Sequence, residues 1–529
     1  MRAVEAPTTK PAPVPAPTVI NATALYALYQ IVAQHYPVFV DQLAAQGTTL
    51  PKYVAREFDA YFKCGRLEHG FLRVRCTDCH AEQLVAFSCK RRGFCPSCGA
   101  RRMAESAALL VDEVLPQAPM RQWVLSFPFP LRFLFATRPK IMSEVLSVVY
   151  RAIATHLIEK AGHTKTTAQT GAVTLIQRFG SALNLNIHFH MLFLDGVYID
   201  IETRAPPRFH WVKAPTSDDI TQLTNTIAER IGRYLERQGL LERDTGNDYL
   251  SQDAVDDDPM QQLLGHSITY RIAVGPQAGR KVFTLQTLPP RDVNESSASV
   301  GTVSGFSLHA GVGASAHQRD KLERLCRYIA RPAVSEKRLS LTAHGKVQYQ
   351  LKTPYRDGTT HVVFEPLDFI ARLAALVPKP RVNLTRFHGV FAPNSQHRAR
   401  ITPARRGKGS QPKTDATGDR TPAEGHAAMT WAQRLKRVFH IDIETCSQCG
   451  GMAKIIACIE DPAVIEKILT HLNKKAAGVE PARLPESRAP PQAVLFDGLQ
   501  ETIQPEVPLA SEAVRPLSVS KPEWVGKWK

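Results

Sequence analysis

The chain is 529 residues long, carries a formal net charge of +17 and is 43% hydrophobic, which suits a globular protein of two or more domains. It has no run of about 18 apolar residues, and residues 1–20 lack the apolar centre of a signal peptide; we therefore expect no membrane segment and a cytoplasmic location. The charge favours a polyanionic partner, nucleic acid first, and ten cysteines in that setting favour metal sites over disulfides.

The N-terminal part of the chain is expected to be helical. Residues 1–20, rich in Pro, Ala and Thr, predict a flexible start. Between residues 21 and 63 apolar side chains recur at helical spacing, and Pro51 marks a turn between two segments. We expect this helical lead-in and the cysteine-rich stretch that follows it to form one domain, residues 21–103.

Six cysteines lie within the 35 residues from Cys64 to Cys98. Two Cys-x2-Cys pairs, separated by fifteen residues, have the spacing of a zinc ribbon and predict one structural zinc held by Cys76, Cys79, Cys95 and Cys98. Cys64 and Cys89 are alternative ligands, as are His69 and His80. Buried thiols without metal are the competing interpretation.

Basic residues surround the second cysteine pair. A rigid, positively charged knuckle is typical of a nucleic-acid contact, although a solvated charge run would look the same in sequence. The candidate DNA-binding residues of this stretch are Lys90, Arg91, Arg92, Arg101 and Arg102.

Residues 104–194 predict alternating helices and strands. The pattern favours helices over 104–115 and 141–160 and strands over 122–127, 172–179 and 187–194. His188 and His190 share one face of the last strand, where two imidazoles can converge on one ion or simply be hydrogen-bonded core residues. If the last two strands form a hairpin, Gln177 lies opposite His188 and is a candidate third ligand, with His309 as the alternative.

The stretch from residue 195 to 332 is less regular. We expect a helix over 217–238, a short strand over Ser267–Ala273 and a Ser/Gly-rich connection over 295–313. A further helix over 317–332 carries Tyr328, with Arg324, Arg327 and Arg331 beside it. A tyrosine among arginines suits attack on a phosphate, because the cations hold the diester and ease ionisation of the phenol. A packing tyrosine in a basic helix is the competing interpretation.

The C-terminal third predicts a hairpin over 339–365, a helix over 366–377 and a basic linker over 396–428. Residues 429–475 are expected to form a small module, with a short helix at 431–439 and a second zinc held by Cys446 and Cys449. Cys458 or His440 could complete that site. Residues 476–529, rich in Pro and Glu, predict a disordered tail.

Taken together, these motifs resemble the HUH endonucleases, and most closely the zinc-binding rolling-circle transposases of bacterial insertion sequences and the related "common region" elements. The resemblance rests on Ser88–Arg102, Arg121–Ser126, Gln177–Gly180, the His188 strand and Arg327–Pro332. It implies an α+β fold in which residues 104–395 form an RRM-like antiparallel sheet with helices on one face.

The resemblance also implies a chemistry. His188, His190 and a third polar ligand would hold Mg²⁺ or Mn²⁺, and Tyr328, with Arg327 and Arg331 beside it, would form a 5′-phosphotyrosine on single-stranded DNA at transposon ends, which is then joined to target DNA. Because Pro332 stands where two-tyrosine members carry a second tyrosine, the chain resembles the single-tyrosine branch, and self-association stays open.

The expected location is the bacterial cytoplasm, on the nucleoid. Two other functions compete: a non-catalytic zinc-dependent DNA-binding regulator, and a replication initiator or relaxase that shares the chemistry. The cysteine pairs ahead of the histidine strand, and the lack of a Walker-type motif, argue against the initiator or relaxase.

Overall fold

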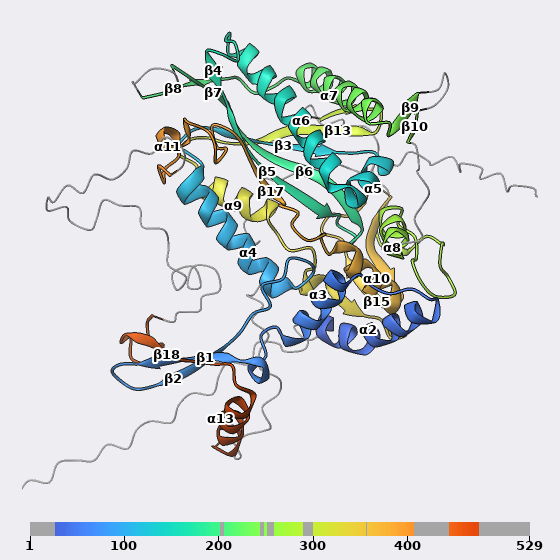
Figure 1. The fold of residues 1–529 in the computed structure, drawn as a ribbon, viewed down its shortest axis with the longest axis vertical. Coiled ribbons are helices and arrows are strands. Elements are labelled where there is room, and N and C mark those ends of the chain that lie inside the picture. The colour runs from blue at the N-terminus through green and yellow to red at the C-terminus, as the bar shows by residue number, and fades with distance from the viewer. Residues whose placement is uncertain are drawn as a thin grey trace, which may run out of the picture.

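The computed structural model describes residues 27–200, 206–243, 248–250, 259–288, 300–355, 357–406 and 444–475. These residues form a mixed α+β structure built from helices and several antiparallel sheets, which confirms the α+β class (Figure 1). The predicted flexible start, the helix at 431–439, the tail and most of the linker lie outside the described residues.

The largest sheet has six antiparallel strands, and its interior strand carries the two histidines. Its order is β12 (Val300–Val303), β13 (Phe306–Ala314), β3 (Met120–Ser126), β6 (Leu185–Leu194), β5 (Gly171–Phe179) and β17 (Thr385–Gly389). β6 is buried almost throughout, because its aromatic and branched side chains face a core on each side. Gln177 pairs directly with His188, so the register expected of this hairpin is confirmed.

Helices cover both faces of this sheet, whereas the resemblance implied one face (Figure 1). On one face Trp123 and Phe193 pack into a large core with α6 (Pro139–Lys160), whose Tyr150 stacks on Phe193. On the other face Leu192 packs in a second core against α4 (Pro96–Leu109), the π-helix η2 (Leu110–Val114) and α9 (Arg319–Ile329). The two histidines lie on this second face.

Helix α6 is the one described helix long and apolar enough to cross a bilayer, by length and composition alone. Its apolar residues, among them Val145, Val149 and Ile153, are buried in the core against the sheet. Core helices of this kind pass the same test, so the helix carries no argument for a membrane.

A second sheet, of order β11-β16-β15-β14, contains the predicted hairpin of residues 339–365. Its strands are β11 (Phe283–Gln286), β14 (Leu339–Leu341), β15 (Val347–Gln350) and β16 (Thr359–Phe364). The N-terminal helix α2 (Ala27–Ala45) packs against α10 (Pro366–Leu376), and both share the large core with α3 (Lys52–Lys63) and α8 (Pro259–Ile268).

A third sheet projects from the body and joins distant parts of the chain (Figure 1). Strand β1 (Phe71–Cys76) lies between β2 (Glu82–Ala86) and β18 (Ala453–Ile459), which is followed by α13 (Pro462–Lys475). The remaining elements are η1 (Leu67–His69), α5 (Phe129–Thr137), β4 (Ala168–Gln169), β7 (Gly196–Ile199), β8 (Arg208–Trp211), α7 (Ser217–Arg237), β9 (Leu241–Arg243), β10 (Asp248–Leu250), η3 (Glu336–Arg338) and α11 (Arg398–Ile401).

Two expectations for the irregular stretch are wrong. The strand expected at Ser267–Ala273 is the end of helix α8 and a following turn, because Met260, Leu263, Leu264 and Ile268 form a buried helical stripe. Part of the Ser/Gly-rich connection is strand: β12 and β13 extend the main sheet beside β3. The helix expected from residue 104 begins earlier, at Pro96.

Candidate active site and metal centres

The two histidines of β6 point their ring nitrogens at each other. His188 Nε2 lies 3.1 Å from His190 Nε2, and both side chains are buried on the face that α9 covers. His188 Nδ1 donates to the carbonyl of Asn186 at 3.0 Å, so its Nε2 carries the free lone pair. His190 Nδ1 lies 2.8 Å from the amide of Gln122, which can turn to donate to it or to accept from it.

Burial keeps both rings neutral. The pKa of His188 is lowered to about 4, first by burial and then by the positive charges of Arg331 and Arg132. The pKa of His190 is also lowered, by burial first and by His188 next. Neutral imidazoles with convergent nitrogens are the form that binds a divalent metal.

The side chain of Gln177 has a free oxygen beside this pair. Its Nε2 donates to the carbonyl of Ile329 at the end of α9 (3.1 Å), while its buried Oε1 has no hydrogen-bond partner among the described residues. His309 is also buried on this face, but it pairs with Val124, one strand further from His190. The orphaned oxygen of Gln177 fits a third metal ligand better than His309 does.

Tyr328 lies against the same histidines. Its ring meets that of His190 edge-on, with centroids 6.4 Å apart, and only 5% of the residue is exposed. The guanidinium of Arg331 lies 4.4 Å from the centre of the Tyr328 ring, and the ammonium of Lys352 lies 4.2 Å from it. The fold therefore brings the tyrosine of α9, the histidine pair of β6 and two cations together.

The other candidate arginines of α9 are arranged differently. Arg327 forms an ion pair with Glu323 at 2.6 Å along the helix, and Arg324 is exposed. Sequence reasoning missed three residues: Gln122, Lys352 and the buried Arg132. A polar residue at an inward position of β3 was the signal for Gln122, whereas Lys352 approaches Tyr328 only through the fold of the second sheet.

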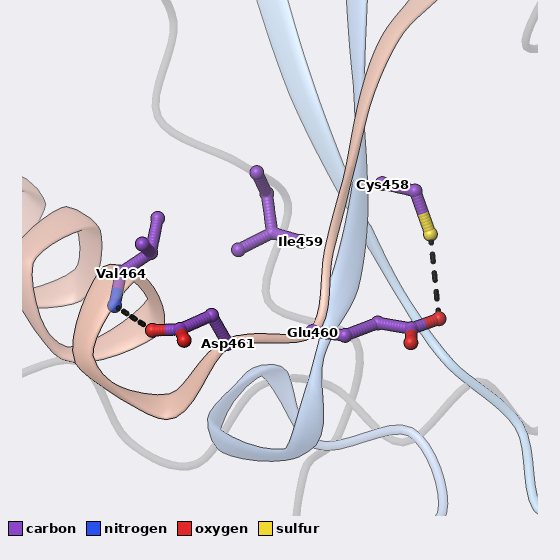
Figure 2. Close-up of a pocket in the computed structure, with 5 residues that line it drawn as sticks. All are labelled: Cys458, Ile459, Glu460, Asp461 and Val464. Atoms are coloured by element: carbon purple, nitrogen blue, oxygen red, sulfur yellow. Dashed lines mark hydrogen bonds between the residues drawn. The ribbon is translucent and has the colours of Figure 1, made fainter.

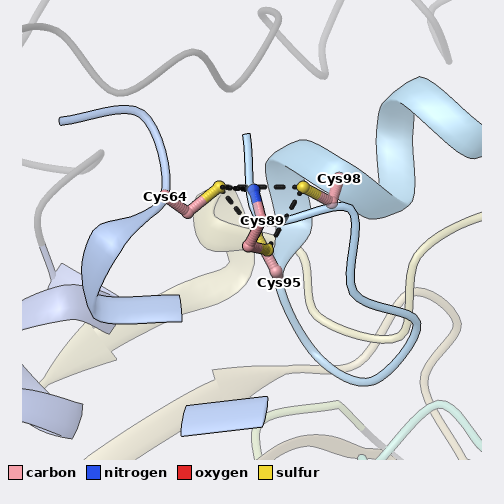
Figure 3. A group of neighbouring side chains, drawn as sticks. All are labelled: Cys64, Cys89, Cys95 and Cys98. Atoms are coloured by element: carbon pink, nitrogen blue, oxygen red, sulfur yellow. Dashed lines mark hydrogen bonds between the residues drawn. The ribbon is translucent and has the colours of Figure 1, made fainter. Parts of the chain in front are cut away.

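Four cysteines at the base of the β1–β2 hairpin form a first thiol group, named centre A: Cys64, Cys89, Cys95 and Cys98. Their side chains point toward one another (Figure 3), with sulfur–sulfur distances of 3.6 Å for Cys64–Cys98, 3.3 Å for Cys89–Cys98 and 3.7 Å for Cys64–Cys95. The edge of a tetrahedron with Zn–S bonds of about 2.3 Å is about 3.8 Å, so the group fits zinc. Hydrogen bonding, from Cys64 first, lowers the pKa of the Cys98 thiol.

A second thiol group, named centre B, joins the tip of the hairpin to the C-terminal segment: Cys76, Cys79, Cys446 and Cys449. The sulfurs of Cys76 and Cys449 are 3.5 Å apart, and those of Cys79 and Cys446 are 3.6 Å apart. Backbone N–H groups of Asp78, Gln448 and Gly451 donate to three of these sulfurs at 3.4 Å. Such N–H···S bonds stabilise thiolates, so this group also fits zinc.

The expected zinc set of Cys76, Cys79, Cys95 and Cys98 does not converge, because the hairpin separates its two halves. Cys64 precedes β1 and Cys89 follows β2, so both lie at the base with Cys95 and Cys98. Cys76 and Cys79 form the opposite end, where Cys446 and Cys449 meet them. Cys458 belongs to neither group: it contacts Glu460 in a shallow hollow near Val464 (Figure 2).

The basic residues near centre A divide into two kinds. Lys90, Arg91 and Arg92 are exposed, although Arg92 also donates to the carbonyl of Val382 at 2.7 Å. Arg101 and Arg102 are half-buried and support the fold: Arg101 pairs with Glu105, and Arg102 donates to the carbonyls of Lys90 and Arg91. The first three residues thus offer the freer positive surface.

Two family models match this chain. Residues 171–399 match the model described as "Putative transposase", which includes Gln177, both histidines and Tyr328. Residues 31–127 match the transposase zinc-binding domain of the IS91 type, which includes all of centre A but only half of centre B. No curated protein and no solved structure matches the chain. The two matches support an IS91-type transposase with structural zinc.

Proposed function

We propose that this chain is a rolling-circle transposase that cleaves and rejoins single-stranded DNA at the ends of its element through Tyr328. The six-stranded antiparallel sheet, with its histidine strand in the interior, supports an RRM-like fold of the HUH class within residues 104–395. Residues 21–103 then form the zinc-binding part, with the module of residues 429–475 attached to it through centre B.

The observation that carries the proposal is the arrangement of Tyr328. The ring of Tyr328 meets that of His190 edge-on, and its centre lies 4.4 Å from the Arg331 guanidinium and 4.2 Å from the Lys352 ammonium. Two cations beside the ring can stabilise the negative charge that the two non-bridging oxygens of a phosphodiester share. A tyrosine with only a packing role would not need a half-buried arginine, a lysine and a histidine pair around it.

The reaction follows from these neighbours. Tyr328 Oη attacks the phosphorus and gives up its proton to solvent, while the bond to the 3′ oxygen breaks and that oxygen takes a proton. The products are a 5′-phosphotyrosine and a free 3′-OH. Arg331 and Lys352 hold the phosphate oxygens in place, and attack by another 3′-OH reverses the step and joins the strand. The phosphotyrosine conserves the energy of the phosphodiester, so no nucleotide cofactor is required.

His188, His190 and Gln177 would hold the catalytic metal, since the two ring nitrogens converge and the unpaired Oε1 belongs to the residue that pairs with His188. Mg²⁺ or Mn²⁺ bound there supplies Lewis-acid stabilisation of the scissile phosphate. The role of the protein is to fix the ligands: Asn186 orients His188, Gln122 orients His190, and the Ile329 carbonyl orients Gln177.

The DNA is expected to lie across the exposed basic residues of this side of the protein. Lys90, Arg91, Arg92 and Arg324 offer charge to the phosphates, with the half-buried Arg101 and Arg102 behind them. Thiolate centres require a reducing compartment, which favours the bacterial cytoplasm and, with DNA as the substrate, the nucleoid.

Because Pro332 takes the place of a second tyrosine, one tyrosine acts twice or a second copy of the chain supplies another.

A covalent-adduct assay tests the proposal. Purified full-length protein is mixed with single-stranded oligonucleotides from the ends of the element, with Mn²⁺ or with EDTA, and adducts are resolved on denaturing gels. We expect an adduct with Mn²⁺ alone, and none in Tyr328→Phe or in the double variant His188→Ala/His190→Ala. Tyr349→Phe is the matched control, since the Tyr349 hydroxyl is engaged by Arg338 and by the Ser335 N–H.

Three results would contradict the proposal. An adduct that persists in Tyr328→Phe would move the nucleophile to another tyrosine, with Tyr355 the next candidate. Specific DNA binding without any adduct would favour the zinc-dependent regulator. Adducts formed on a plasmid replication origin or a transfer origin, but not on element ends, would favour the initiator or relaxase.

A further inference from the structure

Centre A lies at one end of a helix pair whose other member carries Tyr328. Cys95 is the residue directly before helix α4 and Cys98 belongs to its first turn, so two residues of centre A fix where this helix starts. From there α4 and η2 run alongside α9, as Figure 1 shows. Their buried side chains, among them Ala107, Leu110, Leu325 and Cys326, form one core with the sheet.

Both ends of this helix pair are fixed by specific contacts. At the start of α9, the guanidinium of Arg319 donates to the carbonyls of Val111, Leu115 and Pro116 at the end of η2. After the end of α9, Pro332 lies against Gly99, the residue directly after the ligand Cys98. A Cβ atom on Gly99 would stand 2.6 Å from Pro332 Cβ and 3.3 Å from its Cα. The first turn of α4 therefore lies in close contact with the segment that follows α9, four residues beyond Tyr328.

This contact is rigid on both sides. Gly99 sits in a helical turn that two metal ligands hold, and its N–H bonds to the carbonyl of Cys95 at 2.9 Å. Pro332 has a fixed ring, and the atoms nearest to Gly99 are its Cβ and Cα, which no rotamer change can move away. A displacement of either side must therefore be transmitted to the end of α9. There the Ile329 carbonyl bonds to Gln177, and Tyr328 faces His190.

We infer that the contact between Gly99 and Pro332 makes centre A a positioning element for Tyr328, in addition to its role in folding the zinc-binding part. The inference rests on the proposed function of Tyr328 as the nucleophile. Gly99 and Pro332 are positioning residues: neither touches the histidine pair, and both act through the place of α9. In-line attack tolerates little misplacement, since a shift of about 1 Å can cost about a hundredfold in rate.

The test pairs a clash with its relief. Gly99→Ala adds the Cβ that meets Pro332, and Pro332→Gly removes the Cβ that it meets. We expect Gly99→Ala to lower the single-turnover rate of adduct formation at least tenfold, with zinc content and affinity for the oligonucleotide unchanged. In the double variant Gly99→Ala/Pro332→Gly, the single-turnover rate of adduct formation is expected to recover to within about threefold of the rate in Pro332→Gly alone. Gly265→Ala is the matched control, because its Cβ meets only Phe133, at 3.8 Å.

A second measurement does not depend on activity. Amide hydrogen exchange over residues 322–329 reports how firmly α9 is held. We expect faster exchange there in Gly99→Ala and in Cys98→Ser, and unchanged exchange in Cys446→Ser, which removes one ligand of centre B instead. Equal exchange of α9 in Cys98→Ser and Cys446→Ser would overturn the inference. So would a rate of adduct formation in Gly99→Ala/Pro332→Gly that is no higher than the rate in Gly99→Ala.

The outcomes separate this inference from the proposed function. If the wild-type protein forms no adduct, the proposed function fails, while the exchange experiment still decides whether centre A holds α9. If the wild-type protein forms the adduct and Gly99→Ala changes neither its rate nor the exchange of α9, the positioning role alone fails.

Discussion

At the scale of single residues, the identity of the third metal ligand can be decided between Gln177 and His309. Gln177→Ala is expected to weaken Mn²⁺ binding by about tenfold or more, because it removes the unpaired oxygen beside His188. His309→Ala is expected to leave the affinity within about twofold. Electron paramagnetic resonance titration of free Mn²⁺ measures both. Weaker binding in His309→Ala alone would make His309 the ligand.

We expect the free energy of unfolding to depend on pH because of the buried carboxyl group of Glu336. Burial raises its carboxyl pKa to about 8, one carboxyl oxygen has no hydrogen-bond partner among the described residues, and only 6% of the residue is exposed. The folded pKa lies above the ordinary value of 4.5, so the neutral acid is favoured in the folded state. Its contribution to stability is therefore complete below pH 4.5 and is lost as pH rises through 8.

Glu336→Gln keeps the shape of the side chain without this titration. Between pH 6.5 and 8.5 the wild-type protein is expected to lose on the order of 1–2 kcal/mol of unfolding free energy relative to the variant. Urea unfolding of both proteins at the two pH values measures the difference. A difference that is the same at both values would mean that Glu336 is ionised in the folded protein.

At the scale of elements, the hairpin β1–β2 determines which cysteines meet. Cys89 lies at its base and belongs to centre A, whereas Cys458 on β18 belongs to neither centre. We expect two zinc ions per wild-type chain, about one in Cys89→Ser and two in Cys458→Ser. Metal analysis of the purified proteins measures the ratio. Two ions in Cys89→Ser would instead favour the set of Cys76, Cys79, Cys95 and Cys98.

Local sequence patterns could predict some parts of the site but not the contacts between segments that are far apart in the chain. The histidine strand and its pairing with Gln177 were predictable, because a short turn joins two apolar strands whose register follows from local geometry. The cysteine partners were not, because the spacing of Cys-x2-Cys pairs does not reveal that a hairpin separates them. The contact of Lys352 with Tyr328 also depends on how the segment after β15 packs against α9, which no local pattern encodes.

At the scale of the whole molecule, centre B and the pairing of β18 with β1 join residues 76 and 446, which are 370 positions apart. Neither connection is local, and each β18 residue from Ala453 to Cys458 lies half-buried or exposed, so strand pairing alone gives the segment little apolar burial. Zinc at centre B is therefore expected to supply most of the attachment, since structural zinc sites contribute about 10 kcal/mol or more.

A protease site inserted between residues 407 and 443 tests this attachment. After cleavage, the C-terminal fragment is expected to co-elute with the rest of the chain on size exclusion and to separate when a chelator removes zinc. Cys446→Ser/Cys449→Ser should separate without chelator, and Cys458→Ser should behave as the wild type because its thiol lies outside both centres. A fragment that stays bound after zinc removal would show that strand pairing suffices, and one that leaves with zinc present would show that centre B does not join the two segments.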